Sequence, residues 1–122
     1  MDTNVVVVVG NLCADPEVKE VAPDTHLAKI RIAHNTRTKK GEQWESKAHF
    51  FSVEAWRHQA EYAAKHLSKG ALVLVEGRLD HQQWAAEDGS KRDRIVIVAR
   101  NISKYRLPEK TEPVVAEPDL PF

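Results

Sequence analysis

The sequence has few of the features that mark secreted or membrane-bound proteins. Among its 122 residues there is one cysteine, Cys13, so the chain cannot form an internal disulfide, which agrees with a reducing compartment. No apolar run approaches the roughly 20 residues that a membrane-spanning helix needs. Met1 and Asp2 precede a run of valines and not the basic and apolar segments of a signal peptide. With a length suited to a single core, these absences predict one globular domain in the cytoplasm.

A recognisable catalytic or metal-binding pattern is also lacking. Cys13 has no cysteine or histidine at a metal-ligand spacing, and we interpret it as a structural residue. No carboxylate cluster or nucleophile–base pair stands at a recognisable spacing, and the histidines are scattered: His26, His34, His49, His58, His66 and His81. We therefore expect no enzyme, no metal and no cofactor, and a nuclease is the least favoured of the functions considered.

The chain has no net charge, because 18 basic residues balance 18 acidic ones, and this alone argues against nucleic acid as a partner. The balance hides an asymmetry along the chain. Residues 108–122 contain four acids and one base, so residues 1–107 carry three more bases than acids. A mildly basic body permits phosphate binding without requiring it.

Apolar patterns divide the body into five strands and one helix. Val5–Val9 is a β-branched run before a turn signal, so both of its faces should be covered, one by the core and the other most simply by a second copy of the chain. The other strands are Leu27–Ala33, Ala48–Trp56, Leu72–Leu79 and Arg94–Ser103, and the helix is Arg57–Leu67. This order predicts an all-β barrel. It is the order of the OB-fold, a five-stranded Greek-key barrel with its helix between strands 3 and 4 that commonly binds oligonucleotides, although order alone does not distinguish this fold from other small barrels.

The third of these strands carries the strongest functional signal. Alternation directs Phe51 to the core and puts Phe50, Ser52, Glu54 and Trp56 on a face that should meet water. Two rings about 20 Å apart on a wet face suit a partner with π-faces, such as the bases of single-stranded nucleic acid. The alternative is that both rings pack under a loop or against another subunit.

We interpret residues 34–47 as a polar loop that leads into this strand, with Gly41 as a hinge. The loop holds Trp44 near its end and three cations close together, Arg37, Lys39 and Lys40. A charged run is usually only a solvated loop. Beside a stacking surface, however, a basic arm with a tryptophan favours an electrostatic funnel for nucleic acid.

The last two predicted strands form a long hairpin around the turn signal at residues 88–89. One arm carries Trp84, and the other carries three cations, Lys91, Arg92 and Arg94. The pattern leaves open whether Trp84 covers the end of the barrel or protrudes from it.

Composition changes after the body. Residues 108–122 contain four prolines, no periodicity and net negative charge, so we expect a disordered acidic tail outside a domain of residues 1–107. An apolar tip on an acidic tether is typical of a peptide ligand for another protein, and a sequence accident is the alternative. The tip consists of Asp119, Leu120, Pro121 and Phe122.

Four segments also carry a resemblance to a known family. They are NVVVVVGNLCADPEV at 4–18, HFFSVEAWRHQAEYAAKHLSKGALVLVEGRL at 49–79, QQWAAEDGSKRDRIVIV at 82–98 and EPDLPF at 117–122. In this order they resemble bacterial single-stranded DNA-binding protein, and the resemblance covers nearly the whole chain.

The resemblance implies a homotetramer of OB-folds whose first strands pair across a subunit boundary. It implies a nucleoid-associated protein that binds and protects single-stranded DNA without strong sequence preference during DNA replication, recombination and repair. The stacking aromatics of the family align with Phe50, Trp56 and Trp84. A further stacking position aligns near Thr38, for which Trp44 is either a substitute or a residue that packs at the foot of the strand. The tip of the tail, in the family, binds partner proteins of DNA metabolism.

We therefore predict a mechanism with two parts. Cations neutralise phosphates, and the candidates are Arg37, Lys39, Lys40, Arg57, Lys91 and Arg92. Aromatic rings stack on bases, and the candidates are Phe50, Trp56, Trp84 and Trp44. The alternative is a specialised paralogue that acts mainly as a protein-recruiting adaptor and binds DNA weakly, which the zero net charge and Thr38 favour slightly.

Overall fold

The computed structural model describes residues 3–105 of the chain, and the predicted tail with its tip, residues 108–122, lies outside the described residues. Within residues 3–105 no helix is both long and apolar enough to cross a membrane. In chain order the elements are β1 (Val6–Leu12), β2 (Glu17–Ala22), β3 (Thr25–Lys40), β4 (Gln43–Trp56), α1 (His58–His66), β5 (Leu72–Ala85) and β6 (Lys91–Lys104).

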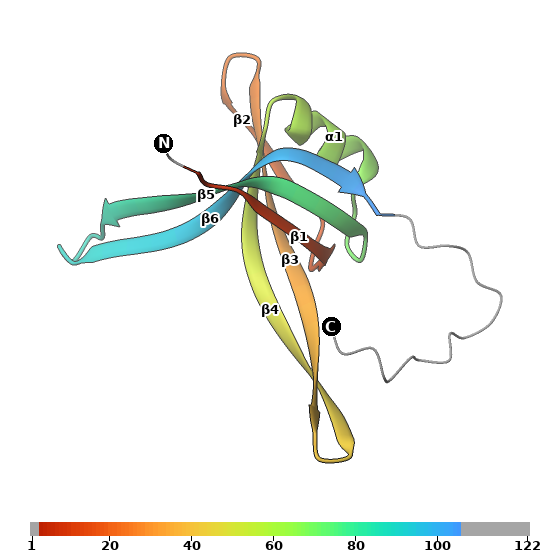
Figure 1. Ribbon diagram of the computed structural model, residues 1–122. Helices are drawn as coiled ribbons and strands as arrows, with labels where there is room; N and C mark the ends of the chain where they lie inside the picture. Colours follow the sequence, from red (N-terminus) through yellow and green to blue (C-terminus); the bar gives the residue numbers. More distant parts are fainter. Residues whose placement is uncertain (1–2, 106–122) are drawn as a thin grey trace.

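Five of the strands close into a barrel in the order β1-β5-β6-β4-β3, and β1 pairs again with β3 (Figure 1). The closing contact is short, with Asn11 opposite Ala33 and Leu12 opposite Ile32. β4 and β6 run parallel, while the other neighbours are antiparallel. Helix α1 connects the third and fourth strands of this barrel. The predicted OB-fold is therefore confirmed.

The barrel interior is filled by apolar side chains that alternate along the strands. Ile30 and Ile32 of β3, Val53 of β4, and Val73 and Val75 of β5 are at most 5% exposed. Two alanines of α1 are fully buried in the same cluster, and the helix packs against β3, β4 and β6. Side chains this small let the helix axis approach the strands closely, so α1 contributes to the core although it is only nine residues long.

Two long hairpins extend beyond the barrel and leave it in different directions (Figure 1). β3 and β4 stay paired out to Lys40 and Gln43, and residues 34–49 are here called the β3–β4 arm. β5 and β6 stay paired out to Ala85 and Lys91, and residues 80–95 are called the β5–β6 arm. The predicted long hairpin is thus confirmed.

The prediction of a polar loop at residues 34–47 is wrong. This segment continues β3 and β4, and Gly41, with φ +63°, begins the turn between them. The arm has no buried face over most of its length, so the sequence carries no apolar alternation that would mark it as paired strands. β2, a sixth strand that pairs with β3, escaped prediction for the same reason, because all of its residues are exposed.

The valine run is covered on only one face within this chain. Val6 and Val8 pack against the core, whereas Val5 and Val7 are 59% and 57% exposed. The expectation that both faces are covered is therefore not met by a single chain.

Arg57 forms a strained connection between β4 and α1. Its backbone has φ 55° and ψ −115°, a combination that residues other than glycine rarely adopt. The Arg57 N–H donates to the carbonyl oxygen of His26 at 2.9 Å, and the Arg57 carbonyl accepts from the Glu61 N–H at 3.0 Å. These two bonds hold the turn, so the helix begins at His58, one residue later than predicted.

Gly77 lies at the irregularity of β5 opposite β6, where the barrel leaves no room for a side chain. An added Cβ would stand 2.1 Å from the carbonyl oxygen of Val98. The backbone of β6 would have to move, and Gly77→Ala should therefore lower the free energy of unfolding by roughly 3 kcal/mol, measured by urea denaturation. Gly41→Ala, where nothing lies within 4 Å of the added carbon, should cost only about 1 kcal/mol, for its positive φ. Equal losses in the two variants would contradict this account.

Candidate nucleic-acid interface

β4 carries three aromatic side chains, Trp44, Phe50 and Trp56, on one face. The register with β3 has no bulge between them, so alternation is kept along the whole strand. Phe50 is 53% exposed and Trp56 is 38% exposed, and Trp44 is partly exposed near the tip of the β3–β4 arm. The predicted shared face of Phe50 and Trp56 is confirmed, because the register is unbroken up to Trp56.

Cations of β3 share this face and lie against the rings. Arg31 stands opposite Ser52, donates to its hydroxyl at 3.4 Å, and has its guanidinium carbon 5.4 Å from the centre of the Phe50 ring. Arg37 lies 5.1 Å from the centre of the Trp44 ring, and the Lys39 Nζ lies 5.9 Å from the same ring. These distances are within the range of cation–π attraction. Phe50 and Trp44 therefore each have a positive group beside them.

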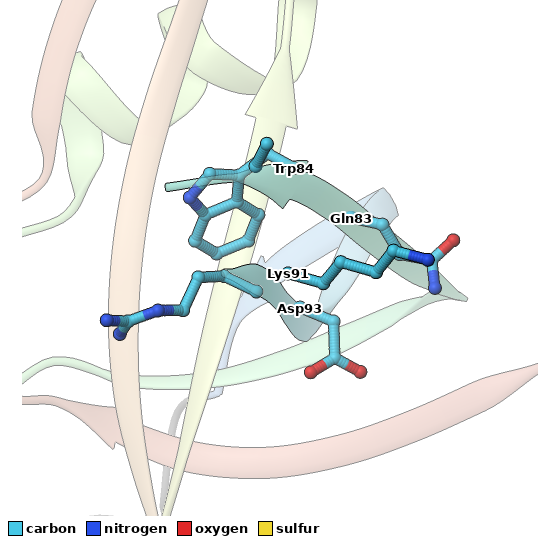
Figure 2. Close-up of a pocket in the computed structure, with 6 residues that line it drawn as sticks. Gln83, Trp84, Lys91 and Asp93 are labelled. Carbon is cyan, nitrogen blue, oxygen red and sulfur yellow. The ribbon is translucent and has the colours of Figure 1, made fainter. Parts of the chain in front are cut away.

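The β5–β6 arm repeats this arrangement with Trp84, which is 48% exposed. Arg92 stands opposite Trp84 in the ladder, and the guanidinium carbon of Arg94 lies 5.7 Å from the centre of the Trp84 ring. A shallow groove runs along this arm, lined by Gln83, Trp84, Ala85, Lys91, Arg92 and Asp93 (Figure 2). Trp84 therefore protrudes with the arm and does not cover the end of the barrel.

Three of the predicted cations are not brought to these two faces. Lys40 lies on the opposite face of the β3–β4 arm, as does Thr38, and its Nζ is 3.7 Å from a carboxylate oxygen of Glu45. Lys91 follows the opposite face of the β5–β6 ladder from Trp84, although it lines the same groove at the end of the arm. Arg57 lies at the start of α1.

Arg31 was not among the predicted phosphate contacts, although it contacts Phe50, and Arg94 was omitted although it contacts Trp84. In the segment LAKIRIA at 27–33, Ile30 and Ile32 alternate with Lys29 and Arg31. This alternation puts Arg31 on the outer face of its strand and is the signal that could have identified it.

Two side chains of β4 depart from the alternation-based expectation. Glu54 was expected to meet water but is only 8% exposed, because Gln82 and Arg94 of the other arm lie over its carboxylate. Phe51 was expected in the core but is 38% exposed. The barrel ends at this point of the strand, so the inner face of β4 continues as an open face.

The tip of the β5–β6 arm is held by a compact turn. The Ser90 hydroxyl donates to Asp88 Oδ1 at 2.6 Å, and the Ser90 N–H donates to the same oxygen at 2.9 Å. These two bonds stabilise the charged carboxylate and lower the pKa of Asp88 below its ordinary value, the hydroxyl bond contributing most. Arg92 also lies near this turn, with its Nε donating to the Ser90 hydroxyl at 3.3 Å.

Within residues 3–105, no group of three or more histidine, cysteine, aspartate or glutamate side chains lies close enough together to hold a metal ion.

Comparison with known proteins places this geometry in a family. Residues 3–105 match the single-strand binding protein family. The chain is 37% identical over 101 residues to a single-stranded DNA-binding protein of Treponema pallidum, covering 83% of this chain and 57% of that protein. It is 36% identical over 110 residues to one of Aquifex aeolicus, covering 89% and 74%, and 38% identical over 104 residues to one of Corynebacterium glutamicum, covering 83% and 46%. The chain thus spans about half to three quarters of the length of these relatives, and it belongs to the single-strand binding protein family.

Proposed function

We propose that this protein binds and protects single-stranded DNA without strong sequence preference. The observation that carries the proposal is the presence of exposed aromatic rings with cations beside them at two places, on the outer face of β3 and β4 and on the β5–β6 arm. Phe50 is accompanied by Arg31, and Trp84 by Arg94. The three proteins compared above bear the name of single-stranded DNA-binding protein, which supports the same substrate.

Stacking supplies the part of the affinity that is indifferent to base identity. Every base has a π-face, so a ring such as Phe50, Trp56 or Trp84 gains about 1–3 kcal/mol from stacking on it whichever base it is. In duplex DNA these faces are covered by neighbouring base pairs. A preference for single strands therefore follows from the exposure of the rings and requires no hydrogen bond to a base edge.

Phosphate neutralisation supplies the part of the DNA affinity that depends on salt concentration. Arg37 and Lys39 lie on the ring-bearing face of the β3–β4 arm, and Arg92 on that of the β5–β6 arm. A cation that contacts a phosphate releases a condensed counterion, and the affinity then falls as salt concentration rises.

The functional assembly in this proposal is a homotetramer in the cytoplasm, associated with the nucleoid. The exposed Val5 and Val7 support an assembly, since apolar side chains on one face of the first strand favour burial against another copy. The proposal includes recruitment of DNA replication, recombination and repair proteins by the tip residues 119–122, which rests on the sequence resemblance alone. A protein that acts mainly as an adaptor is the second candidate, and the zero net charge of the chain favours it.

Joint replacement of Phe50, Trp56 and Trp84 by alanine should lower the affinity for a thymine oligonucleotide by about 100-fold or more, because all three rings stop stacking on bases. The measurement is fluorescence anisotropy of a labelled oligonucleotide. Tyr105→Ala removes a comparably exposed ring, 45% exposed just after β6, and should leave the affinity unchanged. An undiminished affinity of the triple variant would refute stacking and leave the adaptor as the better account.

The two faces of the β3–β4 arm give a matched test of phosphate neutralisation. Arg37→Gln combined with Lys39→Gln should flatten the plot of log affinity against log salt by about 0.7 for each phosphate that is no longer neutralised. Lys40→Gln, on the opposite face of the same arm, should leave the slope unchanged. If Lys40→Gln flattens the plot as much as the pair does, the arm attracts DNA by net charge and not by the face assigned here.

The tip can be separated from DNA binding by a single substitution. Phe122→Ala should reduce binding to purified partner proteins of replication and repair by about ten-fold, as expected for removal of an aromatic anchor, and should leave oligonucleotide affinity unchanged. Surface plasmon resonance with the full chain immobilised measures both. Val115→Ala, in the same tail, is the control and should change neither, and equal partner binding by the Phe122 variant would remove the recruiting role.

A further inference from the structure

Glu54 is an exceptional residue in this barrel. Within residues 3–105 it is the only charged or polar residue that is buried, with 8% of its surface exposed. Burying a carboxylate is costly unless partners replace the water that surrounded it. It lies on the ring-bearing face of β4, two residues before Trp56.

Both partners of the carboxylate come from the β5–β6 arm. The Gln82 Nε2 donates to Glu54 Oε2 at 3.1 Å, and the Arg94 Nη2 lies 3.9 Å from the same oxygen. The Arg94 Nε also donates to Gln82 Oε1 at 2.9 Å. The three side chains therefore form a closed triangle of polar contacts between two different ribbons.

This triangle lies where backbone pairing between the ribbons ends. Within the described residues, β4 and β6 share only two residue pairs, Val53 with Ile97 and Glu54 with Val98. Residues 80–95 then extend away from β4 as a free arm (Figure 1). Past that short ladder, the side chain of Glu54 connects β4 to the base of this arm.

The contacts continue from Arg94 to Trp84. The guanidinium that Glu54 holds is the group that lies 5.7 Å from the centre of the Trp84 ring. Arg31, which lies beside Phe50, has a hydroxyl partner in Ser52 and not a buried carboxylate. The ring on the free arm is therefore the one whose cation is tied back to the barrel.

From these contacts we propose that Glu54 is a positioning residue for DNA binding. It holds Arg94 and Gln82, and through them it fixes the β5–β6 arm relative to β4. One DNA strand can then contact both the Trp84 ring and the rings of β4. The inference rests on the proposed function, because it assumes that Trp84 stacks on a base.

The test uses the full chain with Trp44→Phe and Trp56→Phe, so that Trp84 is its sole tryptophan. In this background Glu54→Ala should lower the extent to which a saturating thymine oligonucleotide quenches Trp84 emission, and should lower the affinity by about ten-fold, the decrease expected for one base stack. The anisotropy decay of Trp84 in the free protein should show a more mobile ring. Glu54→Gln keeps an acceptor oxygen for both partners and should restore most of the quenching.

Glu45→Ala is the matched control. It removes one carboxylate from the same strand, and Glu45 contacts Lys40 at the tip of the other arm. This control should leave the quenching and the anisotropy of Trp84 unchanged. Gln82→Ala removes the hydrogen bond between Gln82 and Glu54 from the other side, at a residue that is only partly buried. This variant replaces Glu54→Ala in the test if Glu54→Ala does not fold.

The outcomes separate this inference from the function on which it rests. Unchanged quenching, affinity and anisotropy in the folded Glu54→Ala or Gln82→Ala variant would overturn the positioning role. If the oligonucleotide binds the variant in which Trp84 is the sole tryptophan without quenching its emission, stacking on this ring is refuted instead. The positioning role is then refuted as well.

Discussion

The interface depends on one constraint, the two-residue period of paired strands, which is kept beyond the barrel. In β4 the period that buries Val53 in the core also puts Phe50 and Trp44 on one face, because the register with β3 has no bulge. The same ladder brings Arg31 and Arg37 to that face. A one-residue slip would move the rings and their cations to opposite sides of the arm. Packing in the core thus fixes the register of β3 and β4, and this register determines which side chains share the exposed face of the arm.

The sequence predicted the parts of the fold that bury apolar side chains. Ile30 and Ile32 alternate with cations and identified β3, and the small residues of α1 identified the helix between the third and fourth barrel strands. The outer half of the β3–β4 arm could not be found in this way, since neither of its faces is buried. For the same reason Lys39 and Lys40 looked equivalent in a loop, whereas neighbours in a strand point to opposite faces.

Burial of Glu54 was hidden from the sequence for a different reason. Alternation gives the face of a residue, and Glu54 does lie on the outer face of β4. What covers it is a pair of side chains, Gln82 and Arg94, that lie about 30 to 40 positions further along the chain. Contacts of this kind follow from how two ribbons cross, which periodicity does not describe. The site is therefore predictable where it depends on one ladder, and not where it joins two.

Zero net charge, which first argued against a nucleic-acid partner, loses its force once the partners of the cations are known. Arg31 and Arg37 lie against aromatic rings and not against carboxylates, while Lys40, on the other face, is paired with Glu45. A guanidinium on a ring keeps its full charge and its free N–H donors for a phosphate. An ion-paired cation would first have to leave its carboxylate. On the ring-bearing face of β3 and β4, positive potential is thus determined by which cations are paired, and the sum over the chain does not measure it. On the β5–β6 arm, Arg92 and Arg94 each have a carboxylate beside them, Asp88 and Glu54.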